Sequence, residues 1–348
     1  MRTFVVVVNG LRLHGLRWDE PGRGRPALLL HGLASNARIW ERVAPALEQG
    51  GLVPVALDLR GHGLSDKPDD GFDWATVSED LRAAVCDLGM QSPILIGHSW
   101  GAGLALHLAA SGLGDGAAPS GMVLIDGGIS QLDDLPGATW DRVSELLAPP
   151  PLAGMSRQDL LRRLSDPSRR WQPDPHSLDI TLANFEVLSD DTVRPRLSRE
   201  HHMQLLRGLY DFRTYAAFDR VRCPTLVVSA RPPEPRRLEE EAHLLLKDKG
   251  VERARQVIPD LHAVWMEDTV HDIPLQRPAE LASTILSWAE ARGLISVAWG
   301  SRREPHLADQ RRRTARPATH RRSMPHVDWP PVSGCGRPPP PTSPPSGA

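Results

Sequence analysis

The sequence has few cysteines, few lysines and no long apolar run. Its three cysteines, Cys86, Cys223 and Cys335, are far apart and show neither paired nor metal-ligand spacing. No stretch approaches the eighteen or so consecutive apolar residues that a membrane-spanning helix needs. The sequence therefore predicts no disulfide, no metal site built on cysteine and no membrane segment.

The start of the chain lacks the pattern of a secretion signal. The stretch "MRTFVVVVNGLRLHG" runs from valines into charged residues through the turn-forming pair Asn9-Gly10, which predicts a β-hairpin. A cytoplasmic location is the expectation that follows. The hydrophobic content of 40% is typical of a globular protein.

Basic charge is concentrated at the C-terminal end. From Leu294 onward there are nine arginines, no lysine and three acidic residues, a net charge of about +6, which leaves about −8 for the rest. An acidic body without a basic face predicts no nucleic-acid binding. The proline-rich residues 293–348 lack hydrophobic periodicity and are expected to form a disordered, dispensable tail, with a basic binding arm as the alternative.

Short apolar runs alternate with longer amphipathic segments. This alternation predicts an α/β fold, in which helices flank a mostly parallel sheet. The expected strands lie in "PALLLHG", "LVPVALDLRG", "SPILIGHS", "GMVLIDGG", "CPTLVVSA" and "ARQVIPDLHAVWME", after an antiparallel pair at the N-terminus. The expected helices are residues 37–49, 74–88, 101–111 and 278–292.

One interval interrupts the alternation. Between Ile129 and about Arg222 no strand is predicted, and segments such as "GATWDRVSELLAPP" favour helices. The expected organisation is a core of residues 1–128 and 223–292, a helical cap of residues 129–222 and the tail. Caps of this kind cover sites at the carboxyl ends of strands.

Ser99 is the candidate nucleophile. It lies in Gly97-His98-Ser99-Trp100-Gly101, which matches G-x-S-x-G and follows an expected strand and precedes an expected helix. A serine held in such a strained turn projects its hydroxyl outward. Side chains two positions away on either side would collide, so glycine is needed there.

A nucleophilic serine needs donors for the oxyanion that forms at the attacked carbonyl. The backbone N–H of Trp100 is one candidate. The loop "HGLASNARIW" offers a second, because Gly32 lets the chain turn so that the Leu33 N–H faces the same oxygen. These positions predict an oxyanion hole made by Leu33 and Trp100.

Three motifs together carry a resemblance to a known family. The sequence resembles an α/β-hydrolase over residues 5–292, because "HGLASNARIW", "DLRGHGLSDKP" and "GHSWGAG" stand in that family's order and spacing. The resemblance implies the α/β-hydrolase fold with a cap. It also implies that His31 and His62, within these loop motifs, are structural hydrogen-bonding groups rather than bases.

The resemblance implies that the catalytic base is a histidine late in the chain, after the nucleophile and the acid. His262 and His271 compete for this role. His262 falls inside the last expected strand, where a packed histidine is the ordinary outcome. His271 falls in the loop before the last helix, where the family keeps its histidine, and is therefore preferred. Asp272 beside it is expected to stabilise the loop.

The catalytic acid has two candidates. Family members usually carry an aspartate after the strand that corresponds to "CPTLVVSA", but the loop "RPPEPRRLEEE" contains none. Glu234 in that loop is one alternative. Asp126 in "VLIDGG" is the other and the preferred one, since Gly127 and Gly128 would let the backbone turn into the site.

A serine at this position favours acyl transfer over the reactions of relatives with an aspartate nucleophile. A small, apolar carboxylic ester is the first candidate substrate, and the residues imply neither a metal nor an organic cofactor. Lactone, thioester and carbon–carbon bond hydrolysis, peracid formation, acyl transfer to another acceptor and non-catalytic binding remain alternatives. Trp100, Trp140 and Tyr210 are the expected substrate-binding residues. The oligomeric state stays open.

Overall fold

The computed structural model describes residues 1–18, 24–114, 116–135 and 137–296, all within one compact unit of residues 1–300. Cys335 and residues 297–348 of the expected tail lie outside the described residues. Within the described ranges, none of the helices combines the length and the apolar character of a membrane span.

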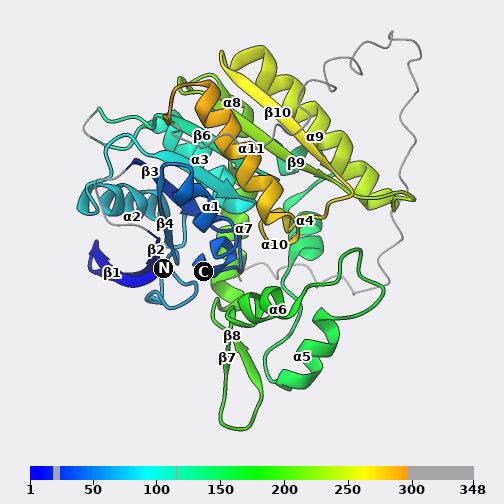
Figure 1. The fold of residues 1–348 in the computed structure, drawn as a ribbon. Helices are drawn as coiled ribbons and strands as arrows, with labels where there is room; N and C mark the ends of the chain where they lie inside the picture. The colour runs from blue at the N-terminus through cyan, green and yellow to red at the C-terminus, as the bar shows by residue number, and fades with distance from the viewer. Residues whose placement is uncertain (19–23, 115, 136, 297–348) are drawn as a thin grey trace, which may run out of the picture. The chain divides into compact units, whose positions relative to one another are not determined.

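The core is an eight-stranded sheet in the order β1-β2-β4-β3-β5-β6-β9-β10 (Figure 1). Strands β1 and β2 pair antiparallel, as do β2 and β4, and the other neighbouring pairs are parallel. The strand bounds are β1 Arg2–Val8, β2 Leu11–Arg17, β3 Arg25–Leu30, β4 Leu52–Leu57, β5 Ile94–His98, β6 Gly121–Ile125, β9 Thr225–Arg231 and β10 Leu261–Glu267. The predicted mostly parallel α/β sheet and its N-terminal hairpin are confirmed.

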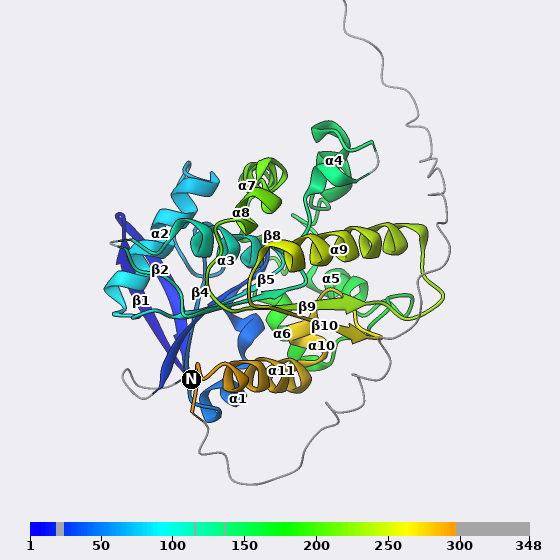
Figure 2. The ribbon, with the colours of Figure 1, turned by 90° about the horizontal axis from the view of Figure 1, so that it is seen from above.

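Helices cover both faces of the sheet because its parallel strands are buried on both sides. All six residues of β4 are buried. One face packs against α2 (Trp74–Asp87), α3 (Trp100–Ser111), α8 (Thr214–Phe218) and α9 (Leu238–Val257), and the other against α1 (Ala44–Gln49) and α11 (Pro278–Ala291) (Figure 2). Alternate strand residues therefore enter two separate apolar cores.

Two predicted boundaries were wrong. The helix expected over residues 37–49 is broken into the 3-10 helix η1 (Ala37–Trp40) and α1, because Pro45 is accommodated only in the first turn of a helix. The strand expected from Ala254 begins instead at Leu261. Residues 254–257 form the last turn of α9, and its apolar residues face the core with helical spacing.

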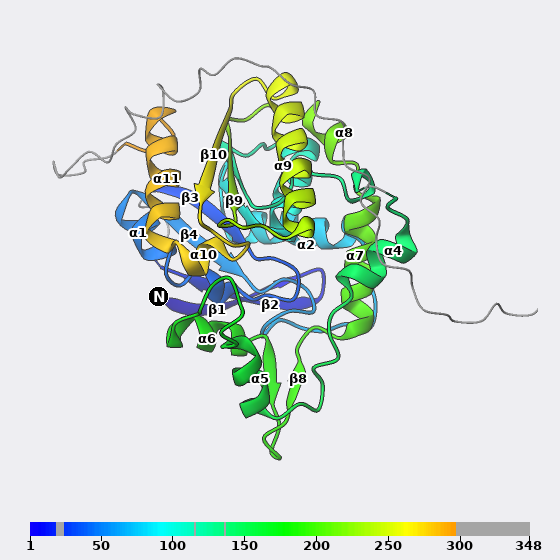
Figure 3. The same cartoon turned by 90° about the vertical axis from the view of Figure 1, so that its right-hand side faces the viewer.

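The interval 129–222 contains helices, as expected, but it also contains two strands. Its helical elements are η2 Leu132–Asp134, α4 Trp140–Leu147, α5 Arg157–Leu164, α6 Pro175–Leu182, α7 Arg199–Asp211 and α8. Strands β7 (Phe185–Val187) and β8 (Val193–Pro195) form an antiparallel hairpin. Three residues are too few to show a period of two, so the sequence pattern did not reveal them. Figures 1 and 3 place α5, α6 and this hairpin together at one end of the unit.

Candidate active site

Ser99 occupies a strained turn between β5 and α3. Its backbone angles are φ 55° and ψ −118°, and its N–H donates to the Ile125 carbonyl at 2.8 Å. A Cβ atom on Gly97 would lie 2.2 Å from the Gly101 carbonyl oxygen, and one on Gly101 would lie 2.4 Å from that of Leu30. The predicted need for glycine on both sides of the serine is therefore present in the geometry.

His271 and Asp126 meet at the carboxyl end of the sheet. His271 lies between β10 and the short helix α10 (Ile273–Gln276), and Asp126 directly follows β6. The His271 Nδ1 atom is 2.7 Å from Asp126 Oδ2. Asp126 also has a positive φ of 45°, and its N–H donates to Val228, so the backbone turns here as the glycines after it suggested. The structure brings these two predicted residues together.

The Asp126 carboxylate is 1% exposed, and both of its oxygens have partners. Oδ1 accepts a hydrogen bond from the Ala230 N–H at 2.8 Å and lies 2.7 Å from the Lys247 ammonium. Burial raises the pKa of Asp126, but the hydrogen bond from His271 and the charge of Lys247 outweigh burial and hold that pKa below its usual value. Asp126 is therefore ionised at neutral pH.

The imidazole of His271 has one side bound and one side open. Its side chain is 53% exposed and lines the cavity that also contains Ser99. Loss of surrounding water lowers the pKa of His271, but the hydrogen bond and the charge of Asp126 outweigh it and raise that pKa. No hydrogen bond joins Ser99 Oγ to His271 among the described residues; such bonds commonly tighten only when a substrate binds.

His98 connects the serine turn to the histidine loop. Its Nε2–H donates to the backbone carbonyl of His271 at 2.9 Å, and the two rings are 4.9 Å apart. Burial lowers the pKa of His98 to about 4, so this ring is neutral at physiological pH. A neutral His98 keeps the loop of His271 attached beside Ser99.

The expected oxyanion donors come from two parts of the chain: Leu33 lies in the loop after β3, and Trp100 is the first residue of α3. Among the described residues, neither the Leu33 nor the Trp100 backbone N–H donates a hydrogen bond to another protein group. The neighbouring loop is held by two histidines: His62 Nε2 accepts from the Ala34 N–H, and His31 Nε2 accepts from that of Leu59. Both rings are buried and bond to backbone groups, which agrees with a structural role.

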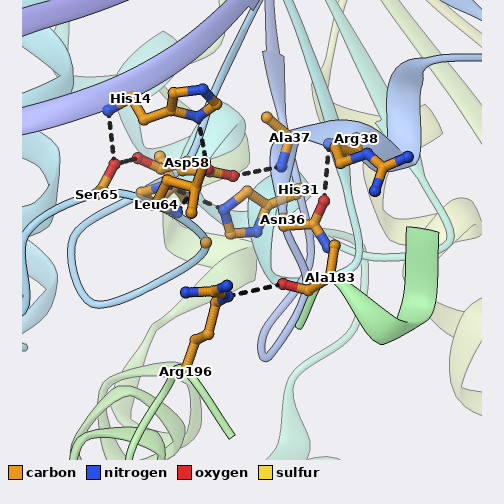
Figure 4. A network of polar contacts seen from close by, with 12 residues as sticks. His14, His31, Asn36, Ala37, Arg38, Asp58, Leu64, Ser65, Ala183 and Arg196 are labelled. Atoms are coloured by element: carbon orange, nitrogen blue, oxygen red, sulfur yellow. Dashed lines mark hydrogen bonds and ion pairs between the residues drawn. The ribbon is translucent and has the colours of Figure 1, made fainter. Parts of the chain in front are cut away.

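Asp58, which directly follows β4, fixes the same loop (Figure 4). Its carboxylate accepts hydrogen bonds from the Ala37 N–H at 2.6 Å and the Leu64 N–H at 2.9 Å, and it lies 2.8 Å from His14 Nδ1. Burial opposes ionisation of Asp58, but the hydrogen bond from His14 helps to lower its pKa to about 2. This carboxylate therefore ties together β2 and the loops after β3 and β4.

A cavity of about 160 Å³ opens above Ser99. The core contributes Leu33, Ser99 and His271, and the interval 129–222 contributes the opposite wall. That wall consists of Leu164, Arg169, Trp171, Pro173, Leu178, Ile180, Thr181 and Asn184. The interval expected to be a cap thus lines the cavity from the side opposite the sheet.

The three expected substrate-binding side chains do not line this cavity. Trp100 is 1% exposed and stacks on His62 inside the core. Trp140 and Tyr210 contact each other, with their ring centroids 5.6 Å apart, on α4 and α7. An aromatic residue in the sequence does not reveal which face of its helix meets the cavity. Among the aromatic side chains of the interval 129–222, Trp171 lines the cavity.

The alternative acid, Glu234, and the alternative base, His262, lie away from Ser99. Glu234 is 67% exposed and forms an ion pair with Arg236, whereas the Nδ1 atom of His271 is already bound by Asp126. His262 is the second residue of β10, so it lies at the amino end of that strand, away from the carboxyl ends where Ser99 and Asp126 lie. It is also exposed rather than packed as expected.

The comparisons with known proteins agree with this architecture. A family model described as the alpha/beta hydrolase family matches residues 27–284. The chain belongs to the alpha/beta hydrolase family. Its expected fold is thereby confirmed.

The relatives of this chain differ in their named activities. AB hydrolase superfamily protein YisY of Bacillus subtilis (strain 168) is 29% identical over 163 residues, 44% of this chain and 60% of that protein. Soluble epoxide hydrolase of Corynebacterium sp. (strain C12) is 41% identical over 103 residues, 30% of this chain and 35% of that protein. The match thus spans less than two thirds of either relative's length.

A solved structure shares the fold over most of this chain. E-2-(acetamidomethylene)succinate hydrolase superimposes with a TM-score of 0.64 at 21% sequence identity, covering 83% of this chain and 99% of that chain. At this identity the likeness establishes the fold alone.

Sequence reasoning missed Lys247 and Arg169 at the site. Lys247 lies 121 positions after Asp126 on the long helix α9, and no motif surrounds it. Arg169 lies between α5 and α6 in a segment without periodicity. The sequence contains few lysines, but this scarcity does not indicate that any one of them lies at the site. No group of three or more His, Cys, Asp or Glu side chains suited to a metal ion occurs in the described ranges.

Proposed function

We propose that this protein is a serine hydrolase that cleaves a small carboxylic ester through an acyl-enzyme at Ser99. The observation that carries the proposal is the buried Asp126 carboxylate, which holds Nδ1 of His271 at 2.7 Å in a cavity that also contains Ser99. Serine, histidine and aspartate in this arrangement perform acyl transfer on several unrelated folds.

The hydrogen bond to Asp126 assigns the two nitrogens of His271. Nδ1 carries the proton that it donates to the carboxylate, so the lone pair of Nε2 is free to accept the proton of Ser99 Oγ. Oγ then forms a bond to the ester carbonyl carbon. The resulting oxyanion accepts hydrogen bonds from the N–H groups of Leu33 and Trp100.

Collapse of this intermediate breaks the bond to the alcohol oxygen, which takes the proton from Nε2 of His271. The acyl group stays on Ser99 Oγ. A water molecule then gives a proton to Nε2, and its oxygen attacks the same carbonyl carbon. The second tetrahedral intermediate collapses by breaking the bond to Oγ, which takes the proton from Nε2, and the carboxylic acid is released. Asp126 remains ionised throughout and stabilises the imidazolium that forms twice in the cycle.

The cavity favours a small acyl or alcohol group. A volume of about 160 Å³ fits a short chain or one ring, and Leu33, Leu164, Trp171 and Ile180 supply apolar surface beside polar groups such as Thr181 and Asn184. A short ester fills this space and leaves its carbonyl at Ser99.

The proposal is tested with a panel of p-nitrophenyl esters from acetate to decanoate. We expect turnover of the shorter esters by the wild type and a loss of roughly 10⁴-fold or more in Ser99→Ala. Ser229→Ala is a matched control, because Ser229 is a buried serine in β9 outside the cavity lining. Turnover that survives in Ser99→Ala would contradict the proposal.

A second candidate is hydrolysis of a small amide that carries a carboxylate. The observation in its favour is Arg169, which lines the cavity; Asp166 is an acidic neighbour of Arg169, but the pair forms no ion pair within 4 Å among the described residues. Arg is the side chain best suited to bidentate binding of a carboxylate. The succinate in the name of the structurally similar hydrolase is a dicarboxylate, and such a substrate would use Arg169 while its scissile carbonyl lies at Ser99.

Esters with and without a terminal carboxylate distinguish the two candidates. If Arg169 binds substrate, Arg169→Ala raises KM for a succinate monoester by roughly tenfold and leaves KM for a butyrate ester unchanged. Arg163→Ala on α5 is the matched exposed control, since Arg163 does not line the cavity. Equal KM values for the succinate monoester in all three proteins exclude the second candidate.

A further inference from the structure

Lys247 reaches the buried carboxylate of the proposed site from the helical layer. It belongs to α9, and its Nζ atom lies 2.7 Å from Asp126 Oδ1 and 3.2 Å from the Ala230 carbonyl oxygen. The lysine side chain is 19% exposed and the aspartate side chain 1% exposed, so water screens this ion pair only weakly. The ion pair thus couples α9 to the ends of β6 and β9.

A second lysine on the same helix shows what an ordinary ion pair looks like here. Lys249 lies two residues further along α9 and pairs with Asp134 Oδ1 at 2.8 Å, but its side chain is 58% exposed. Neither Lys249 nor Asp134 lines the cavity. Lys249 therefore provides a comparison of the same chemistry, on the same helix, outside the proposed site.

We propose that Lys247 is a positioning residue: it holds Oδ1 of Asp126, so that Oδ2 faces Nδ1 of His271, and it offsets part of the negative charge that Asp126 presents to that histidine. This inference rests on the proposed function, because it assigns Asp126 and His271 to the reaction. Lys247 itself touches neither Ser99 nor the cavity.

The geometry gives Lys247 two separable effects. As a donor, it fixes the rotation of the Asp126 carboxylate together with the Ala230 N–H, and only Oδ2 is left for His271. As a positive charge, it competes with the imidazolium for the same carboxylate. An imidazolium beside an unpaired aspartate would be stabilised more strongly, and His271 would stay protonated to a higher pH.

Other charged and titratable groups near His271 act on it together with Lys247. The neighbouring residue Asp272 favours its protonated form, and His98 lies against its ring. The charged and titratable groups that act on His271 are Asp126 after β6, Asp272 before α10, His98 at the end of β5 and Lys247 on α9, and Arg169 between α5 and α6 lines the same cavity as His271. Of the two cations, Lys247 is the one in contact with the partner of His271.

The test measures the titration of His271 in Lys247→Met, Lys247→Gln, Lys247→Arg and the control Lys249→Met. Imidazole NMR signals are followed against pH, and the His271 signal among the 14 histidines is identified by its absence in His271→Gln. The acid limb of kcat/KM for a p-nitrophenyl ester is measured in parallel. Gln keeps a hydrogen-bond donor at position 247 without the charge, so it separates the two effects and guards against loss of folding in the Met variant.

Removing the charge is expected to raise the midpoint of His271 by roughly one pH unit in Lys247→Met and Lys247→Gln. The acid limb then moves upward equally, and at a pH one unit below the new midpoint kcat/KM of these variants is about fivefold lower than that of the wild type. Lys247→Arg and Lys249→Met keep the wild-type midpoint. A purely structural lysine would change the melting temperature without moving this titration.

An unchanged midpoint in both folded, uncharged variants would overturn the inference, and so would an equal shift in Lys249→Met. The NMR titration needs no turnover, so it is independent of the proposed function. If the wild type turns over no ester while the Lys247 variants still shift His271, the proposed function fails and the assignment of Lys247 stands.

Discussion

Asp58 and Asp126 are both buried aspartates that bind the Nδ1 atom of a histidine, at 2.8 Å from His14 and 2.7 Å from His271. Both also accept hydrogen bonds from backbone N–H groups. They differ in what lies beyond the histidine. The side chain of His14 is 13% exposed within β2, whereas that of His271 is 53% exposed and borders the cavity that contains Ser99.

An aspartate–histidine pair does not by itself make a catalytic group. Asp58 uses its pair to tie loops together, and His14 does not line the cavity that contains Ser99. Asp126 uses the same chemistry to orient the imidazole of His271, which does line that cavity. The surroundings of the histidine, rather than the pair, determine which role follows.

Replacing each aspartate by asparagine should produce the largest difference between the two pairs. Asp126→Asn is expected to lower kcat by roughly 10⁴-fold, because asparagine no longer selects the productive tautomer of His271. Asp58→Asn should leave kcat within about tenfold of the wild type, since Asp58 only supports the loop that carries Leu33. The measurement is kcat for an ester that the wild type turns over. Equal losses in the two variants would contradict the distinction.

The pH dependence of kcat/KM should be determined by the titration of His271 and should not depend on His14. Asp126 holds the pKa of His271 above its ordinary value of about 6.5, and the reaction needs the neutral imidazole. The acid limb of kcat/KM should therefore have its midpoint above about 6.5, with a tenfold loss for each pH unit below it. His14→Gln should keep that midpoint, and a shift there would show that the two pairs are not independent.

The pH dependence of stability should reveal the contribution of the buried Asp58 carboxylate. The pKa of Asp58 is lowered to about 2 in the folded protein, so Asp58 contributes stability above its unfolded pKa of about 4 and loses it as the pH falls toward 2. That contribution is roughly 2 kcal/mol. The raised pKa of His271 acts with the other sign: its contribution is present below the unfolded pKa and is lost as the pH rises through the folded pKa.

Urea unfolding between pH 2 and pH 7 measures this effect. Asp58→Asn should lose about 2 kcal/mol at pH 7 and nearly nothing at pH 2 relative to the wild type. A stability difference that does not change over this range would show that Asp58 acts through packing rather than charge.

The smallest expected effect concerns the wall of the cavity opposite Ser99. Trp171→Ala should change the ratio of kcat/KM between short and long acyl esters by roughly tenfold, because Trp171 lines the cavity. Trp140→Ala should leave that ratio unchanged, since Trp140 packs on Tyr210 outside it. If Trp140→Ala changed this ratio and Trp171→Ala did not, Trp140 would contact the substrate, as the sequence predicted.

Much of the site could be predicted because its parts are local. The glycines around Ser99 and the loop containing Leu33 each lie within a few residues of one another, so their steric requirements are visible in the sequence. His271 was placed by its position between the last strand and the last helix. Parallel strands then bring their carboxyl ends, and these loops, to one edge of the sheet.

The remaining features depend on contacts between distant segments. The choice between Asp126 and Glu234 required the position of His271, 145 residues beyond Asp126. Lys247 meets Asp126 only because α9 packs across the ends of β6 and β9. The cavity wall depends on how residues 129–222 fold against the core. As a result, Trp171 lines the cavity and Trp140 does not.

The most direct test of the central claim is reaction with a fluorophosphonate probe, followed by mass spectrometry of the labelled peptide. The account predicts one label, on Ser99, formed rapidly by the wild type and by Asp58→Asn and about a thousandfold or more slowly by Asp126→Asn. A wild-type protein that remains unlabelled, or that reacts at another serine, would contradict the assignment of Ser99, His271 and Asp126 as a nucleophile, base and acid.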